Sequence, residues 1–117
     1  MSVATLPAKS VKSSKEITPS APPVMPGDRV FQSAATVFGL LQDKTRLQLL
    51  WLMRQRPGLN VAGLCEAVGM TQPAISHHLA LLRVADLVDA RHEGKCNYYS
   101  ISRAGKPVVD FVLKVIG

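Results

Sequence analysis

The sequence predicts a mainly α domain with a small β-hairpin, in the order helix, helix, helix, helix, strand, strand, helix. Apolar residues recur at three- and four-residue spacing over most of residues 29–117, as on one face of an α-helix. This period is lost between residues 87 and 101, where two short apolar runs flank a turn. Aromatic residues make up only 5% of the 117-residue chain, which favours packed helices over a sandwich of sheets.

Residues 1–28 are rich in Ser, Pro, Ala and Lys. We expect a disordered tail, because this composition buries too little apolar surface to offset the entropy of ordering the chain. The tail is interpreted as an inert leader, with contact between its lysines and DNA phosphates as the alternative. No apolar run is long enough to cross a bilayer or to form a secretion signal, so a soluble, cytoplasmic protein is expected.

Two helices are expected before residue 58. The first covers residues 29–42, and the second begins after Asp43, whose side chain is a good N-cap. Pro57 and Gly58 end the second helix. Trp51 is expected in the core. The basic residues of this helix are interpreted as a solvated face, with phosphate contact by some of them as the alternative; they are Lys44, Arg46, Arg54 and Arg56.

A third and a fourth helix follow closely. Asn60 is expected to cap the third helix, and Gly69 to close it in the left-handed conformation that glycine tolerates best. Thr71 starts the fourth helix, with Pro73 in its first turn, where proline costs little. His78 lies at the edge of the apolar stripe of this helix and is expected to form local hydrogen bonds.

The rest of the chain predicts a hairpin and a last helix. Residues 87–92 and 96–101 read as strands joined by a tight turn at residues 93–95, and Ser102 is expected to cap the last helix. Apolar residues of the first and last helices offer more surface than a core this small can cover. We therefore expect a homodimer paired through these two helices.

The third and fourth helices form a helix-turn-helix pattern, and the basic hairpin that follows has the position of a wing. The outward face of the fourth helix is short or hydrogen-bonding, and no acid lies between residues 67 and 85. A helix that enters the major groove needs such a face. The sequence thus predicts a winged helix-turn-helix that binds double-stranded DNA through Thr71, Gln72, Ala74, Ser76, His77, Arg91 and Lys95.

The charge of the chain agrees with a polyanionic partner, since the net charge is +6 and the pI is about 9.8. The rival interpretation is a winged-helix module that binds only protein, and the basic wing favours DNA. No glycine-rich phosphate loop or catalytic arrangement is present. Ser76 and His77 are neighbours that point to different sides of a helix, so an enzyme is not expected.

Three stretches resemble the arsenical-resistance-repressor (ArsR/SmtB-like) family of transcriptional regulators. Residues 42–50, QDKTRLQLL, resemble the start of its second helix, residues 69–79, GMTQPAISHHL, its recognition helix, and residues 94–101, GKCNYYSI, its wing. The resemblance covers residues 29–117. It implies a homodimer paired through the first and last helices that binds an inverted repeat and usually represses. Many family members are released from DNA by a metal ion or by thiol oxidation.

The resemblance also implies two metal sites, at which this chain departs from the pattern. Asn60 and Ala62 replace the cysteines of the helical site, and Gly63 replaces an acidic residue beside them. Arg103 and Gly105 replace the Asp and His of the site in the last helix. These residues cannot supply thiolate, carboxylate or imidazole ligands. We therefore expect no metal at either site and no cofactor.

Two cysteines leave thiol sensing open as an alternative. Cys65 shares an apolar helical face and is expected to pack as a small hydrophobe, whereas Cys96 follows the wing turn and is the more reactive candidate. A repressor that senses oxidation through Cys96, joined by Cys65, is the resulting hypothesis. A disulfide requires Cα atoms within about 7 Å, which the expected helix-to-wing geometry disfavours. No spacing of Cys and His typical of zinc sites is present.

Overall fold

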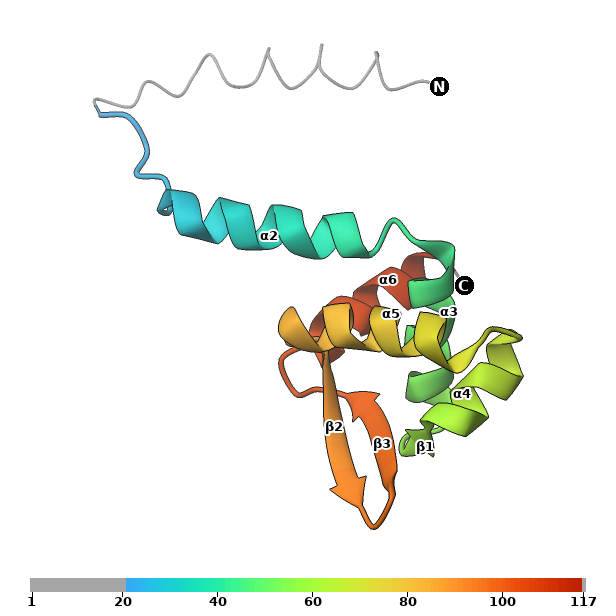
Figure 1. Ribbon diagram of the computed structural model, residues 1–117. Coiled ribbons are helices and arrows are strands. Elements are labelled where there is room, and N and C mark those ends of the chain that lie inside the picture. The colour runs from blue at the N-terminus through green and yellow to red at the C-terminus, as the bar shows by residue number, and fades with distance from the viewer. Residues whose placement is uncertain (1–20, 117) are drawn as a thin grey trace.

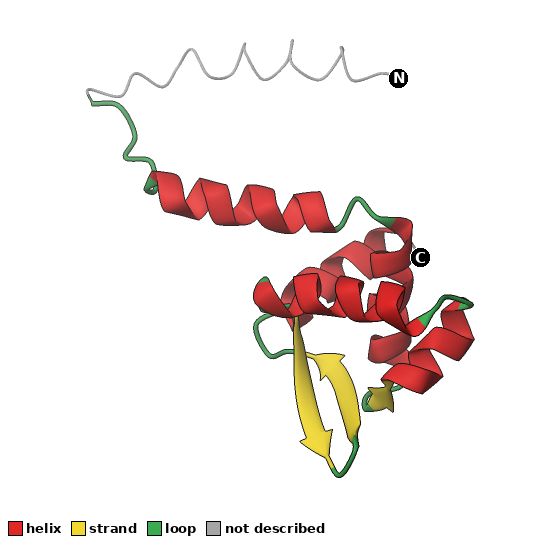
Figure 2. Ribbon diagram, in the orientation of Figure 1, coloured by secondary structure: helices red, strands yellow, loops and turns green. Residues whose placement is uncertain are grey.

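The computed structural model describes residues 21–116. The elements run in the order α2 (Asp28–Leu40), α3 (Lys44–Gln55), β1 (Leu59–Asn60), α4 (Val61–Val68), α5 (Gln72–Val84), β2 (Val88–Glu93), β3 (Cys96–Ile101) and α6 (Lys106–Ile116). Helices dominate, and the small sheet projects from them as a hairpin (Figures 1 and 2). The predicted fold class, a mainly α winged helix-turn-helix, is confirmed.

The predicted tail lies mostly outside the described residues, which begin at residue 21. Residues 21–27 are exposed and form no helix or strand before α2 begins at Asp28. Within the described part of the chain, every helix is too short or too polar to cross a membrane.

The sheet has three strands rather than the expected two. It has the order β1-β3-β2 with both pairs antiparallel, and Leu59 of β1 lies opposite Tyr99 of β3. The N–H of Gly58 also donates to the carbonyl oxygen of Tyr99, at 3.1 Å. The expected element order therefore lacked one strand between the second and third helices. A strand of two residues is too short to show an alternating pattern of apolar and polar residues in the sequence. It can be recognised only from its pairing with β3 in the structure.

Side-chain caps set the starts of three helices as the sequence predicts. Asp43 accepts a hydrogen bond from the N–H of Arg46 at 3.1 Å, and Asn60 accepts one from the N–H of Gly63 at 2.8 Å. Thr71 caps α5 by accepting from the N–H of Ala74, at 3.4 Å. Each cap satisfies one of the backbone donors that a first helical turn leaves without a partner.

Ser102 has a different role from the expected one, because α6 begins only at Lys106. Its hydroxyl accepts from the N–H of Gly105 at 2.8 Å and donates to the carbonyl oxygen of Asp86 at 2.6 Å. Its carbonyl oxygen accepts from the N–H of Lys106. Ser102 therefore caps the turn that leads into α6 and ties that turn to the end of α5.

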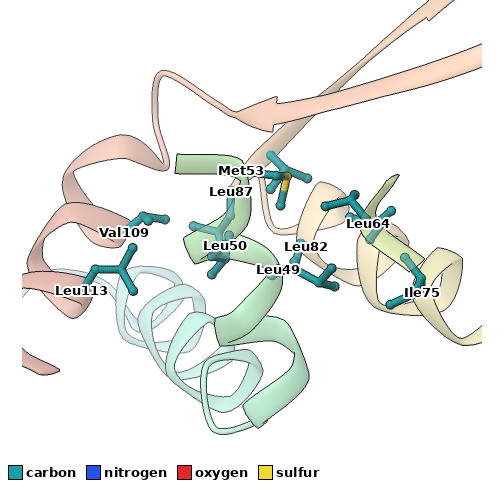
Figure 3. Packing of buried hydrophobic residues seen from close by; sticks show 11 residues of the cluster. Leu49, Leu50, Met53, Leu64, Ile75, Leu82, Leu87, Val109 and Leu113 are labelled. Carbon is teal, nitrogen blue, oxygen red and sulfur yellow. The ribbon is translucent and has the colours of Figure 1, made fainter. Parts of the chain in front are cut away.

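The core is centred on α3. Leu49, Leu50 and Met53 of α3 are at most 1% exposed and pack among buried side chains of α4, α5, β2 and α6. Figure 3 shows these side chains converging from the surrounding elements, with Val109 and Leu113 of α6 reaching the cluster from one side. Because α5 contributes three fully buried residues, its orientation is fixed by apolar packing; these residues are Ile75, Leu79 and Leu82.

Large apolar side chains remain exposed on α2 and α6. No residue of α2 is buried, and the helix lies at the periphery of the domain, alongside the other helices (Figure 1). Phe38 of α2 is 66% exposed, and Phe111 of α6 is 68% exposed. Trp51 is also half exposed, so its expected place in the core is wrong. The buried side of α3 is occupied by its leucines and Met53, and Trp51 falls outside that stripe.

The backbone of Gly105 approaches that of Leu87 closely. A Cβ atom at position 105 would lie 2.4 Å from the carbonyl oxygen of Leu87 and 2.8 Å from its Cα. Both neighbours are backbone atoms, so a side chain at this position requires the start of α6 to move away from the residue that leads into β2.

We predict that Gly105→Ala lowers the free energy of unfolding by about 1–3 kcal/mol, the usual cost of overpacking a close contact. Urea unfolding followed by circular dichroism measures the change. The matched control is Gly39→Ala in α2, because a Cβ at position 39 meets nothing within 4 Å. If the two variants have the same stability, the close contact between Gly105 and Leu87 does not limit the size of the residue at position 105.

The Asp43 cap predicts a pH-dependent contribution to stability. The N–H of Arg46 donates to this carboxylate and lowers its pKa from the ordinary value of 3.8, and the nearby positive charge of Arg46 acts in the same direction. A lowered pKa in the folded state stabilises the protein above the ordinary pKa. This contribution is lost as the pH falls through 3.8 and below.

Asp43→Asn keeps the cap but removes the charge, so we predict a stability at pH 7 within about 1 kcal/mol of wild type. Urea unfolding at pH 7 and pH 3 should show that the advantage of wild type over this variant shrinks at the lower pH. Asp43→Ala, which removes the cap, should cost about 1 kcal/mol at pH 7. An unchanged difference between wild type and the Asn variant at the two pH values would contradict the assignment.

Candidate nucleic-acid interface

The turn between α4 and α5 sets the angle at which α5 leaves the core. Gly69 adopts φ 79°, in the left-handed region, and its N–H donates to the carbonyl oxygen of Cys65 at 2.7 Å. The next residue, Met70, donates from its N–H to the same oxygen. The hydroxyl of Thr45 on α3 donates to the sulfur of Met70, at 3.6 Å. The turn is thus held by two backbone hydrogen bonds to Cys65 and by the side-chain contact between Thr45 and Met70.

The two faces of α5 differ in chemistry. The inner face carries the three buried residues of the core, whereas Gln72, Ser76 and His77 are exposed. Their side chains can donate and accept hydrogen bonds, as contact with base edges requires. The structure therefore leaves all three predicted residues exposed on α5, a helix that itself carries no acidic residue.

The other two predicted residues lie at the start of this helix. Thr71 is exposed, but its hydroxyl is already the acceptor of the helix cap. Ala74 is half-buried and has no polar side-chain atom. Thr71 thus caps α5 and still has a hydroxyl hydrogen that can donate, whereas Ala74 offers only apolar contact.

The wing carries the predicted basic residues Arg91 and Lys95, and both are exposed. The guanidinium of Arg91 donates to Glu93 at 3.0 Å and lies 5.4 Å from the centre of the Tyr98 ring. The Arg91–Glu93 ion pair is about 60% exposed on both sides. An ion pair this exposed is weak, so Arg91 can exchange Glu93 for another anion at little cost.

Sequence reasoning missed two polar or aromatic partners in the wing. Tyr98 lies opposite Arg91 in the hairpin register, and Asn97 lies opposite His92. The side-chain oxygen of Asn97 is 2.7 Å from Nδ1 of His92. Both pairings follow from the two-residue connection between the strands, in which Gly94 has a φ of 62°. Counting residues outward from this turn in the sequence would have predicted them.

A set of polar contacts joins α3 to its neighbouring helices. Nε of Arg46 donates to Nδ1 of His78 at 3.1 Å, and a second nitrogen of Arg46 donates to the carbonyl oxygen of Leu40 at 3.1 Å. The expectation that Arg46 is solvated and that His78 bonds locally is therefore wrong. Arg54 likewise pairs with Asp110 of α6, at 2.7 Å. Contacts over more than 30 residues leave no pattern in a single sequence.

The residues at the family's metal positions have structural explanations of their own. Asn60 and Gly63 bond to each other in the cap of α4, and Gly105 is pressed against Leu87. Arg103 is exposed. Among the described residues, no three His, Cys, Asp or Glu side chains gather in a way that could hold a metal ion.

The two cysteines are both free and half-buried. Cys65 lies on α4 and packs partly against the core, and Cys96 begins β3 beside the wing turn. The position of Cys65 agrees with a packing role, although it is less buried than Leu64 beside it.

Comparisons with known proteins agree with this geometry. The sequence model of the ArsR family of bacterial regulatory proteins matches residues 43–90, from the cap of α3 into β2. The regulator KmtR of Mycobacterium tuberculosis is 40% identical over 82 residues, which are 70% of this chain and 62% of KmtR. The arsenical resistance operon repressor of Escherichia coli is 42% identical over 66 residues, 56% of each protein. This chain thus spans less than two thirds of the length of these two relatives.

A solved structure resembles the whole domain. The homodimeric winged helix-turn-helix DNA-binding domain of a possible ArsR-family regulator from Mycobacterium bovis superposes with a TM-score of 0.69 and is 30% identical. The match covers 80% of this chain and 90% of that one. With the helix-turn-helix, the wing and the sequence of the recognition helix all in agreement, the chain belongs to the ArsR family of bacterial regulatory proteins.

Proposed function

We propose that this protein is a sequence-specific DNA-binding transcriptional regulator that represses its target genes from an inverted-repeat operator. The observation that carries the proposal is the contrast between the two faces of α5. One face is locked into the core by three fully buried residues, and the other offers exposed hydrogen-bonding groups free of acids. A rigidly held helix of this kind can present the same pattern of donors and acceptors to every operator it meets.

The residues of the interface divide into two roles. Gln72, Ser76 and His77 contact base edges in the major groove and supply specificity. Arg91 and Lys95 of the wing contact phosphates and supply affinity that does not depend on sequence. This regulator has no enzymatic role, and it acts in the cytoplasm, where its operator lies.

The protein acts as a homodimer paired through α2 and α6. Exposed apolar side chains on these helices support this assembly, since α2 has no buried residue and both Phe38 and Phe111 are about two-thirds exposed. A second copy would cover this surface. It would also place two recognition helices about 34–36 Å apart, at successive major grooves.

The alternative is a winged-helix module that binds protein alone. The two proposals differ in their dependence on salt, because a DNA complex releases counterions from the phosphates whereas a mainly apolar protein complex does not. The exposed basic groups of the wing favour DNA.

Our first functional prediction separates the two classes of DNA contact. Gln72→Ala or Ser76→Ala should weaken binding to the operator by about 1–3 kcal/mol and leave binding to unrelated DNA nearly unchanged. Lys95→Ala should weaken both alike and reduce the slope of log K against log salt by about 1.8, which is about 0.9 for each of the two copies of Lys95 in the dimer. Fluorescence anisotropy on an operator duplex and on a scrambled duplex, from 50 to 300 mM salt, measures the affinity for the operator, the affinity for unrelated DNA and the salt dependence of each. Binding of wild type that does not depend on salt would rule out the DNA proposal.

The dimer predicts a second outcome. Phe111→Glu should shift the protein to monomer at micromolar concentration, because a charge would then be buried in the apolar contact between copies. Analytical ultracentrifugation measures the shift. Trp51→Glu is the matched control, since Trp51 is also half exposed but lies on α3, outside the proposed interface. The proposed interface is wrong if the Trp51 variant dissociates and the Phe111 variant does not.

We further propose that the regulator uses neither metal site of its family. Zinc, copper and arsenite should leave the affinity for the operator unchanged within a factor of two, because Asn60, Ala62 and Gly105 supply no ligands for them. A mild oxidant tests the alternative, a thiol switch at Cys96 with or without Cys65. If a metal or the oxidant releases the protein from DNA, repeating the titration on Cys65→Ser and Cys96→Ser locates the responsible thiol.

A further inference from the structure

We infer that Arg46 and His78 form a positioning pair that fixes the recognition helix relative to α2 and thereby sets the specificity of DNA binding. This inference rests on the proposed function of α5. The side chain of Arg46 joins α3 to two other helices. Its guanidinium donates to Leu40 at the end of α2 and to His78 in the middle of α5, while its backbone N–H donates to the Asp43 cap.

The contact with Leu40 explains how α2 is held. The last carbonyl groups of a helix have no partner within the helix, and the oxygen of Leu40 is one of them. Arg46 satisfies this oxygen at 3.1 Å. Because α2 has no buried residue, a bond of this kind weighs more in its placement than it would in a helix anchored by the core.

The contact with His78 reaches the interface directly. His78 follows His77, which is exposed on the proposed DNA-binding face, and the centres of the two rings are 6.0 Å apart. His78 itself is half-buried and lies between the buried residues Ile75 and Leu79 along α5. A change at His78 therefore alters how α5 rotates about its own axis, and with it the direction in which Ser76 and His77 point.

The bond requires a neutral His78. A guanidinium can only donate hydrogen bonds, so Nδ1 of His78 must accept, and a protonated ring has no acceptor. The charged groups that face the ring are Arg46 and Asp43 of α3, together with His77 on its own helix.

Two substitutions at position 78 separate the bond from the packing. Asn has an oxygen at the same distance along the side chain as Nδ1, so His78→Asn retains an acceptor for Arg46. His78→Leu has nearly the shape of the Asn variant but no acceptor. Leu is also the better helix former of the two and suits a half-buried site, so a loss of binding in this variant does not follow from unfolding.

The experiment measures Kd for two duplexes with the full chain. One carries the inverted repeat that wild type selects from a random pool, and the other is a scrambled duplex. At pH 8, His78→Leu should weaken binding to the selected duplex about tenfold, the size of one lost hydrogen bond to a charged group. His78→Asn should stay within threefold of wild type, and all three proteins should bind the scrambled duplex alike.

The Asn variant provides an independent readout. A role that is only structural would make both substitutions at position 78 alike, whereas a role of the hydrogen bond predicts that His78→Asn keeps the preference for the selected duplex and His78→Leu loses it. The inference is overturned if His78→Leu keeps the preference of wild type, if it loses affinity for both duplexes equally, or if His78→Asn loses the preference as fully as His78→Leu does. A wild type that selects no sequence at all would instead refute the proposed function.

Discussion

The packing of α3 against the inner face of α5 is the interaction on which the rest of the structure depends. Leu49, Leu50 and Met53 provide the apolar surface, and the buried residues of α5 complete it. Burial of a leucine or isoleucine side chain contributes about 1.5–3 kcal/mol, so this contact outweighs any single polar interaction in the domain. Because the anchor is apolar and non-directional, it fixes the distance between the helices more strongly than the rotation of α5. Two directional contacts from α3 supply that second constraint, the bond of Thr45 to Met70 in the turn before α5 and the bond of Arg46 to His78 on α5.

The anchor also determines where the polar chemistry can lie. With one side of α5 buried, every group that can meet a ligand must come from the opposite side, and the turn at Gly69 sets the angle of that side to the body of the domain. The hairpin then extends the same surface through basic residues. The specificity and the affinity of the interface are thus carried by different elements. The specificity lies on α5, which is held in the core, and the affinity lies on the β2–β3 hairpin, which pairs along one edge with the two residues of β1.

Local chemistry explains which parts of the fold could be predicted from the sequence. The caps at Asp43, Asn60 and Thr71 act within three residues of themselves, so their roles follow from residue type and position alone. The exposed residues of α5 follow from helical period in the same way. By contrast, β1 exists only because β3 passes beside it, and Trp51 is exposed because other residues of α3 already fill the core. The Arg46–His78 contact joins positions 32 apart, which no local rule connects.

The small size of the core has a consequence for the assembly. In a domain of this length the fraction of surface buried on folding is low, so stability has little margin. The three phenylalanines of the chain are all exposed and lie on α2 and α6. If a second copy covers them, folding and pairing draw on the same surface, and the stability of the domain depends on protein concentration. The orientation of α2 then affects two features of the assembly. It sets the position of the second copy and, through Arg46, the position of the recognition helix α5.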